Sequence, residues 1–258
     1  MTLAPADWLD LLHEIAVRTE DVALRFFRAR DLRVDEKPDR SPVSEADREI
    51  ESVVRAIVGE RYPELAILGE EEGETGAGPG GGGARLIVDP IDGTRNFVRG
   101  IPIFATLLAI EDEGEIVAGV ANAPALGVRW HAARGEGAFR DGRAIHVSGV
   151  RHLDRALVLH GNLGTSEPAP PEGFLALARR AERTRGFGDF YQHVLVAEGA
   201  AEIALDPAVQ PWDVAALQIL VEEAGGRATT IHGERAIRGG SLLTTNGALH
   251  PAALAALA

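Results

Sequence analysis

The sequence predicts an α/β protein of two lobes, with a mixed sheet and a first half in which strands predominate. Apolar runs cluster in the first half, where residues 103–110 and 115–122 are separated by EDEGE and predict a hairpin. Helix and strand patterns alternate in the second half, which is typical of layered α/β folds. We therefore expect a single domain over residues 1–258, with lobes at about 1–147 and 148–258 that share one cleft.

The elements of the first half follow from local patterns. Residues 6–30 place apolar side chains at helical spacing, and a second helix is expected to begin at Ser44, a good N-cap. The segment 33–47 that leads into it is charged and broken by prolines, and a strand is expected to end near Leu68. The stretch 73–83 is rich in glycine and predicts a flexible surface loop. Further strands are expected at 86–89, where Pro90 ends the run, and at 128–132 and 143–147.

In the second half, helices are expected at 171–184, 189–198 and 213–224, with an alanine-rich helix at the end of the chain. Strands are expected at 201–205, 227–231 and 241–245.

Composition excludes several classes of function. The sequence has no cysteine, which rules out disulfides, zinc thiolates and thiol chemistry. The net charge of −13 disfavours nucleic acid and acidic membranes as partners, and no apolar run is long enough to span a bilayer. The acidic N-terminus is unlike a signal peptide, so we expect a cytoplasmic protein. A phosphate ester would also be repelled, unless bound metal ions supply positive charge.

The segment DPIDGT, residues 89–94, holds the most informative pattern. Asp89 and Asp92 directly follow a buried apolar run, and strand ends are where α/β proteins place ligand-binding groups. Two carboxylates could bridge two hard cations such as Mg²⁺, which prefers oxygen ligands. Gly93 lets the backbone approach a phosphate closely, and Thr94 offers a hydroxyl. The alternative is an Asp-rich turn that only caps a strand, because Asp-Gly turns are common.

Three further acids lie at the ends of predicted elements. Glu70 follows the expected strand end near Leu68, or belongs to a solvated acidic run. Asp47 is three residues after Ser44, which a capping box would explain. Asp213 opens a strongly periodic helix, where the helix dipole favours an acid. Each local explanation is adequate alone, but together they leave the gathering of acids at element ends unexplained.

Several blocks of the sequence resemble the inositol monophosphatase superfamily. They are GEE (69–71), DPIDGTRNF (89–97) and WDVAALQILVEEAGG (212–226), preceded by SPVSEAD (41–47). Their order matches the family, and they span nearly the whole chain. The resemblance implies an αβαβα layered sandwich of the inositol monophosphatase and fructose-1,6-bisphosphatase type, and a homodimer.

The resemblance also implies a cleft that binds two or three Mg²⁺ ions. Asp89 would bridge two ions, with Glu70 on one side and Asp92 and Asp213 on the other. The carbonyl of Ile91 and the hydroxyl of Thr94 would complete the metal ligands. A third, looser ion could bind near Glu70, which is also expected to serve in catalysis.

Two residues are implied to act on the attacking water. Thr94, hydrogen-bonded to Asp47, would orient the water and help to deprotonate it. The backbone N–H groups of Gly93 and Thr94 would hold the phosphate. Hydrolysis of a phosphate monoester needs up to about 20 kcal/mol of catalysis, which paired metal ions can supply without a covalent nucleophile.

Lys37 has two interpretations. The resemblance places it in a mobile loop that closes over the metal ions, where it would be a cation near phosphate or water. Alternatively, it is a solvated surface lysine. The eight histidines lack metal-binding spacing and are interpreted as surface or hydrogen-bonding residues, with His193 as the candidate exception.

The segment before the last block is expected to choose the substrate. Its R-x-x-G-D-x-Y pattern, with Arg185, Gly188, Asp189 and Tyr191, resembles the histidinol-phosphate phosphatase branch, and so does TRNFVRGIPIFATL (94–107). Histidinol phosphate carries an ammonium group and an imidazole, which carboxylates in the substrate wall would complement.

Asp189 and Asp206 are the candidate carboxylates, and Arg185 would shape the wall. Asp189 could instead be a helix N-terminal acid and Asp206 a turn residue, while packing is the favoured role of Tyr191.

The predicted function is therefore Mg²⁺-dependent hydrolysis of a small phosphate ester, with L-histidinol phosphate as the first candidate. Inositol 1-phosphate is the alternative substrate. Outside enzymes, a non-catalytic protein that binds metal or phosphate for regulation is the alternative, although the complete acid set argues against it.

Overall fold

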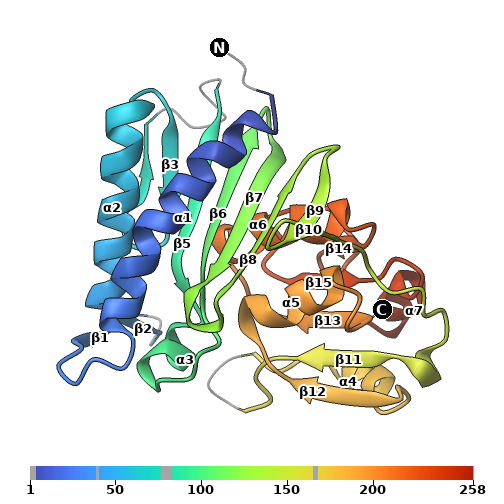
Figure 1. The fold of residues 1–258 in the computed structure, drawn as a ribbon. Helices are drawn as coiled ribbons and strands as arrows, with labels where there is room; N and C mark the ends of the chain where they lie inside the picture. The colour runs from blue at the N-terminus through green and yellow to red at the C-terminus, as the bar shows by residue number, and fades with distance from the viewer. Residues whose placement is uncertain (1–3, 39–40, 77–82, 165–167, 258) are drawn as a thin grey trace.

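The computed structural model describes residues 4–38, 41–76, 83–164 and 168–257, whose elements stack in five layers (Figure 1). Two helices cover one face of a large sheet, and two more lie between this sheet and a smaller one. A last pair of helices covers the outer face of the smaller sheet. The layer order is the predicted αβαβα sandwich.

The large sheet has eight strands in the order β10-β9-β8-β7-β6-β5-β3-β4. β3 and β5 are parallel, and the other neighbours are antiparallel. Its strands are β3 (Ala66–Gly69), β4 (Gly73–Thr75), β5 (Arg85–Asp92), β6 (Ala105–Asp112), β7 (Glu115–Ala123), β8 (Val128–Ala133), β9 (Gly137–Arg140) and β10 (Arg143–Ile145). Because β3 and β5 run in the same direction, their carboxyl ends lie at one edge of the sheet. Glu70 directly follows β3 there, and Asp89 and Asp92 lie in the last four residues of β5.

The smaller sheet has five strands in the order β12-β11-β13-β15-β14. Its strands are β11 (Leu157–His160), β12 (Arg183–Gly186), β13 (Ile203–Asp206), β14 (Arg227–Thr229) and β15 (Leu242–Thr245). A separate hairpin, β1 (Val34–Glu36) with β2 (Pro42–Ser44), leads into the second helix.

The helices bury apolar faces against both sheets. They are α1 (Asp7–Phe26), α2 (Glu45–Arg61), α3 (Thr94–Val98), α4 (Glu172–Ala178), α5 (Asp189–Ala197), α6 (Pro211–Glu223) and α7 (His250–Leu257), with short 3₁₀ turns at Pro124–Leu126 and Leu153–Arg155. α1 and α2 pack on β5–β7, whereas α5 and α6 form the middle layer. α6 is apolar on all sides, which its place between two sheets requires. Among the described residues, no helix is long and apolar enough to cross a membrane.

Several predicted boundaries were wrong. The strand expected to end before Pro90 continues to Asp92, because a bulge between Asp89 and Asp92 removes the need for a proline N–H in the ladder. The helix expected at 171–184 ends at Ala178, and residues 183–186 form the edge strand β12 instead. The first helix ends at Phe26 rather than residue 30, and Arg28 has a positive φ of 63°.

Other strands were not anticipated. The segment 33–47 contains the β1–β2 hairpin, and β9 and β11 were missed. Within the glycine-rich stretch 73–83, residues 73–75 form β4, and the part at 77–82 lies outside the described residues.

Candidate active site

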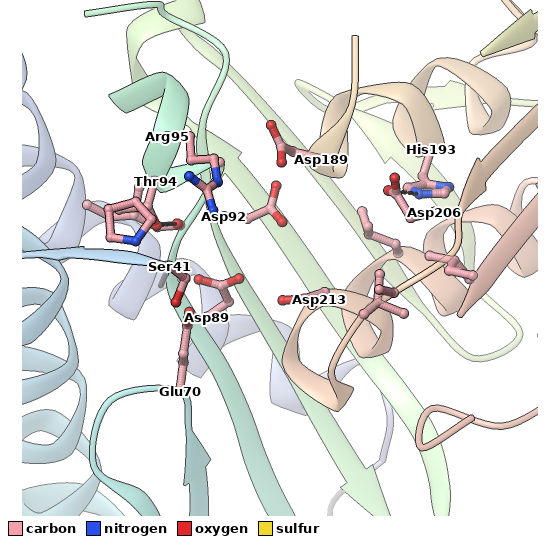
Figure 2. A pocket seen from close by; sticks show the side chains of 17 residues that line it. Ser41, Glu70, Asp89, Asp92, Thr94, Arg95, Asp189, His193, Asp206 and Asp213 are labelled. Atoms are coloured by element: carbon pink, nitrogen blue, oxygen red, sulfur yellow. Dashed lines mark hydrogen bonds and ion pairs between the residues drawn. The ribbon is translucent and has the colours of Figure 1, made fainter. Parts of the chain in front are cut away.

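A pocket of about 190 Å³ opens where the carboxyl ends of β3, β5 and β13 meet the first turns of α5 and α6. Acidic side chains dominate its lining, and Figure 2 shows them converging from both halves of the chain. The acids are Glu70, Asp89, Asp92, Asp189, Asp206 and Asp213. All six were singled out from the sequence.

Asp89, Asp92 and Asp213 form the centre of the pocket. Each offers a carboxylate oxygen, and these oxygens lie within 4.8 Å of one another. The β-bulge in β5 brings the first two acids into the same cavity, because it shifts the register between them. Asp213 reaches the cluster from the first turn of α6.

Burial raises the pKa of Asp89 and of Asp92 well above the usual value, and neighbouring acids add to the effect. For Asp213, burial raises the pKa to about 7, although the backbone N–H of Gln210 stabilises the charged form at 2.7 Å. Among the described residues, none hydrogen-bonds the buried Oδ1 of Asp89. Such a set is electrostatically unfavourable unless a cation is bound.

Asp92 is also fixed by the second half of the chain. Its Oδ2 accepts a hydrogen bond of 2.6 Å from the backbone N–H of Phe190, in the first turn of α5. This contact aligns the carboxylate with the positive end of the helix.

Asp47 and Thr94 meet at one side of the pocket. Asp47 Oδ2 accepts hydrogen bonds from the N–H and hydroxyl of Ser44, at 2.8 and 2.6 Å, which completes the capping box of α2. Its Oδ1 lies 3.4 Å from Thr94 Oγ1, which donates to the carbonyl of Ile91 at 2.9 Å. Burial raises the pKa of Asp47 to about 6. The capping explanation and the contact with Thr94 therefore both hold.

Glu70 also lines the pocket and lies next to a cation. Lys37 Nζ donates to Glu70 and Glu71 at 2.7 Å each, so Lys37 is not a solvated surface residue. Burial alone would lower the pKa of Lys37, but the two carboxylates more than offset it and raise the pKa. Burial also raises the pKa of Glu71 to about 7.

The turn that carries Glu70 is anchored by Glu51, a buried acid of α2. Its carboxylate accepts from the N–H groups of Glu71 and Glu72 at 2.8 and 3.0 Å and pairs with Arg55. A Cβ at Gly69 would collide with this carboxylate, so any larger residue there would displace Glu51 from the turn.

Asp189 enters the pocket from a strained backbone position. Its φ is 51°, unusual for a residue other than glycine, and such strain concentrates at functional sites. Its Oδ2 accepts a hydrogen bond of 2.8 Å from Asn96 Nδ2, which also donates to the carbonyl of Ile103. The hydrogen bond from Asn96 holds the carboxylate of Asp189, which lines the pocket.

Asp206 ends β13 and lines the same pocket. Its Oδ2 lies 3.0 Å from Nε2 of His193, and the two side chains face each other in Figure 2.

The remaining predicted residues of the wall lie outside the pocket lining. Arg185 is exposed on β12 and donates to the carbonyl of Thr184 at 2.7 Å. Gly188 precedes α5 with a φ of 70°. Tyr191 packs edge-on against Phe187, as the packing interpretation predicted.

The chain matches the inositol monophosphatase family over residues 6–258. The chain belongs to this family. It is similar to the histidinol-phosphatase of Mycobacterium tuberculosis, with 46% identity over 97% of this chain and 98% of the relative. The histidinol-phosphatase of Streptomyces coelicolor is 40% identical over 95% of each chain. The solved inositol monophosphatase of Anabaena (Nostoc) has a TM-score of 0.84 and 28% identity, covering 98% of this chain and 95% of that chain.

These matches confirm the predicted family, its histidinol-phosphatase-like branch, the fold class and the enzyme class, a phosphoric monoester hydrolase. Inositol monophosphatase family members depend on metal ions and act on small phosphate esters, and the acidic cluster of this chain is where ions would bind.

Several residues of this pocket and its surroundings were not predicted from the sequence. Arg95 and Ser41 line the pocket, and Asn96 and Glu51 hold Asp189 and the Glu70 turn. Arg95 and Asn96 lie inside the DPIDGTRNF block, so the block itself was the signal. Glu51 gave no signal, because its partners are backbone groups of a distant turn.

Proposed function

We propose that the chain is a Mg²⁺-dependent phosphatase that hydrolyses L-histidinol phosphate to L-histidinol, a step of histidine biosynthesis. The observation that carries this proposal is the pair Asp189 and Asp206, two carboxylates in the same pocket as the acidic cluster. The names of the two most similar relatives described above support the same substrate.

The residues present fit divalent cations. Glu70, Asp89, Asp92, Asp213 and the carbonyl of Ile91 would hold two or three Mg²⁺ ions. The buried Oδ1 of Asp89 and the raised pKa values of the cluster support this, because a cation satisfies both. When bound, the ions supply positive charge that neutralises the phosphate dianion and lowers the pKa of the attacking water.

The chain's own groups position the reactants. Asp47 accepts a proton through Thr94, whose hydroxyl orients the attacking water, and Glu70, which lines the same pocket, supports this step. The N–H groups of Gly93 and Thr94 hold the phosphate, and Gly93 suits this role because its φ is 84° and a Cβ there would lie only 3.0 Å from the carbonyl oxygen of Ile103. Lys37 acts as a cation beside Glu70.

The alcohol part of the substrate binds at the acidic wall. Histidinol carries an ammonium group and an imidazole, and each can donate hydrogen bonds to a carboxylate. Asp189 and Asp206 would receive these groups, and Gly188 directly precedes Asp189 at the start of α5, whereas the exposed Arg185 lies outside the pocket lining. The charged groups of histidinol would add electrostatic attraction to these carboxylates that a neutral polyol does not supply.

Inositol 1-phosphate is the second candidate, supported by the likeness to the Anabaena structure. We also propose that residues 1–258 act as one domain, whose lobes at 1–147 and 148–258 share the metal cleft. The distribution of the acids supports this, since Asp89 comes from the first lobe and Asp213 from the second. A homodimer, a cytoplasmic location and the lack of nucleic-acid and membrane partners stay predictions.

Asp189→Asn tests the substrate assignment. Asparagine tolerates a positive φ, so the backbone should be unchanged while the charge is lost. We expect KM for histidinol phosphate to rise about tenfold or more, since hydrogen bonds to charged groups contribute about 1.5–3 kcal/mol. KM for phenyl phosphate should stay constant.

Asp141→Asn is the matched control, because Asp141 also has a positive φ, of 48°, and lies outside the pocket. Equal increases in KM for both esters in Asp189→Asn would assign Asp189 to helix structure and remove the proposed substrate wall.

A further inference from the structure

His193 lies one turn into α5, with a side chain that is 1% exposed. Its two ring nitrogens contact groups on two strands of the smaller sheet. Nε2 lies 3.0 Å from Asp206 Oδ2 at the end of β13, and Nδ1 lies 2.7 Å from Thr244 Oγ1 on β15. The imidazole therefore bridges a buried hydroxyl and an acid that faces the pocket.

We infer that His193 is a positioning residue, which holds Asp206 as a charged acceptor for the cationic part of the substrate. This inference rests on the proposed function, because it concerns the same pocket. The family match and the names of the relatives assign no role to this histidine.

If the imidazole is neutral, as the inferred role requires, the contacts select which ring nitrogen carries the proton. An ionised Asp206 accepts hydrogen bonds but cannot donate, so Nε2 of His193 carries hydrogen. Nδ1 then accepts from the hydroxyl of Thr244, which is fully buried. Gln192 Nε2 is farther from the ring, at 3.4 Å, and also donates to the carbonyl of Leu205.

This tautomer has a consequence for binding. A neutral imidazole donates one hydrogen bond and leaves the negative charge of Asp206 available, whereas an imidazolium would cancel it. The second carboxylate oxygen, Oδ1, lies beside Gly161, where the Cβ of a larger residue would come within 2.9 Å of it. The contact with His193 thus fixes Oδ2 and orients the carboxylate of Asp206 before substrate binds.

Kinetics of His193→Leu and His193→Gln test this role. Leucine removes the donor, whereas glutamine can place an N–H near the position of Nε2. We expect His193→Leu to raise KM for histidinol phosphate about tenfold, with kcat and the KM for phenyl phosphate within about twofold of wild type. His193→Gln should recover most of the loss. A uniform fall in kcat for both esters would show a merely structural role and overturn the inference.

His250→Leu is the matched control. His250 is also a buried histidine that contacts a threonine of the smaller sheet, with Nδ1 at 3.1 Å from Thr245 Oγ1, but it lies outside the pocket lining. The variant His250→Leu should lower the melting temperature without changing the preference for histidinol phosphate over phenyl phosphate.

A double-mutant cycle with Asp206→Asn shows whether His193 acts through Asp206. His193→Leu should raise KM about tenfold in the wild-type background and by less than about twofold in the Asp206→Asn background. Equal effects in both backgrounds would contradict the inference.

A spectroscopic measurement separates this inference from the proposed function. In NMR spectra of ¹⁵N-histidine-labelled protein without substrate, His193 should show a protonated Nε2 and an unprotonated Nδ1. The signals of His193 are identified as those that disappear in His193→Gln. Asp206→Asn should shift the Nε2 proton. An Nδ1–H tautomer or an imidazolium would overturn the positioning role. If His193 shows the expected tautomer but the enzyme does not hydrolyse histidinol phosphate, the proposed substrate is wrong and the positioning of Asp206 by His193 still holds.

Discussion

Asp213 combines two functions in a single side chain. Its Oδ2 accepts the N–H of Gln210 and completes the capping box of α6, while a carboxylate oxygen joins the cluster with Asp89 and Asp92. Asp47 likewise completes the capping box of α2 and also contacts Thr94. The sequence predicted the capping box at Asp47 and a dipole-favoured acid at Asp213, and the family resemblance implied a site role for both. The local pattern could not show that each side chain makes both contacts, because a local interaction accounts fully for either residue in the sequence.

Asp92→Asn should abolish turnover while the fold is kept. We expect kcat/KM to fall more than about 100-fold, because even partners of metal ligands contribute about 10- to 100-fold. In EDTA, the melting temperature should rise by about 2–4 °C, since one charge that is repelled by its neighbours is removed. Phosphate release and thermal melts measure both effects.

Asp154→Asn, on a surface 3₁₀ turn, is the control and should change neither quantity. Activity of Asp92→Asn near the wild-type value would remove the metal assignment.

At the scale of elements, the turn from β5 into α3 builds the site. The bulge at Pro90 aligns two acids, and Gly93 then starts α3 with a φ of 84°. The sequence predicted a strand that ends before Pro90 and did not predict the bulge, because the bulge depends on pairing with β6. The edge strand β12 was missed for a similar reason. Its residues are mostly exposed and lack apolar alternation, so only its pairing with β11 defines it.

Gly93→Ala should lower both stability and activity. A Cβ there would lie 3.0 Å from the carbonyl of Ile103 and 3.3 Å from Asp189 Oδ2, in addition to the strain of a positive φ. The strain alone costs about 1–2 kcal/mol, which corresponds to a fall in melting temperature of about 2–8 °C. kcat/KM should fall at least about tenfold.

Gly114→Ala isolates the strain, because Gly114 has a φ of 80° and no atom within 4 Å of an added Cβ. It should lose stability and keep full activity. The close-packing argument would be wrong if both variants kept full activity.

At the scale of the whole molecule, the acids lie where the layers meet. Asp89 and Asp92 belong to the large sheet, and Asp213 belongs to a helix of the middle layer, so a bound cation would join the two. The order of strand and helix patterns along the chain predicted two α/β lobes, and the resemblance implied the five layers. The packing of α5 and α6 between the sheets could not be derived from periodicity, because α6 is apolar all round.

The stability of the metal-free protein should fall as the pH rises from about 6.5 to 8. The pKa of Asp213 is raised to about 7, and the pKa values of Asp89 and Asp92 are raised well above the usual value. An acid with a raised pKa binds its proton more tightly in the folded state. Its stabilising contribution is therefore present at low pH and is lost as the pH rises through the folded-state pKa.

Burial lowers the pKa of His13, and of His131 to about 4, so these histidines act in the opposite direction at lower pH. Melts in EDTA at pH 6.5 and 8 should show this loss, and Mg²⁺ should restore stability more at pH 8 than at pH 6.5. A metal-free melting temperature that rises across this range would contradict the electrostatic description of the cluster.

The central claim is that this pocket hydrolyses histidinol phosphate with bound Mg²⁺. The most direct test is phosphate release from L-histidinol phosphate and from myo-inositol 1-phosphate, each with Mg²⁺ and with EDTA. We predict hydrolysis only with Mg²⁺ and a kcat/KM at least about tenfold higher for histidinol phosphate. An equal or higher value for the inositol ester would contradict the substrate assignment, and full activity in EDTA would contradict the metal site.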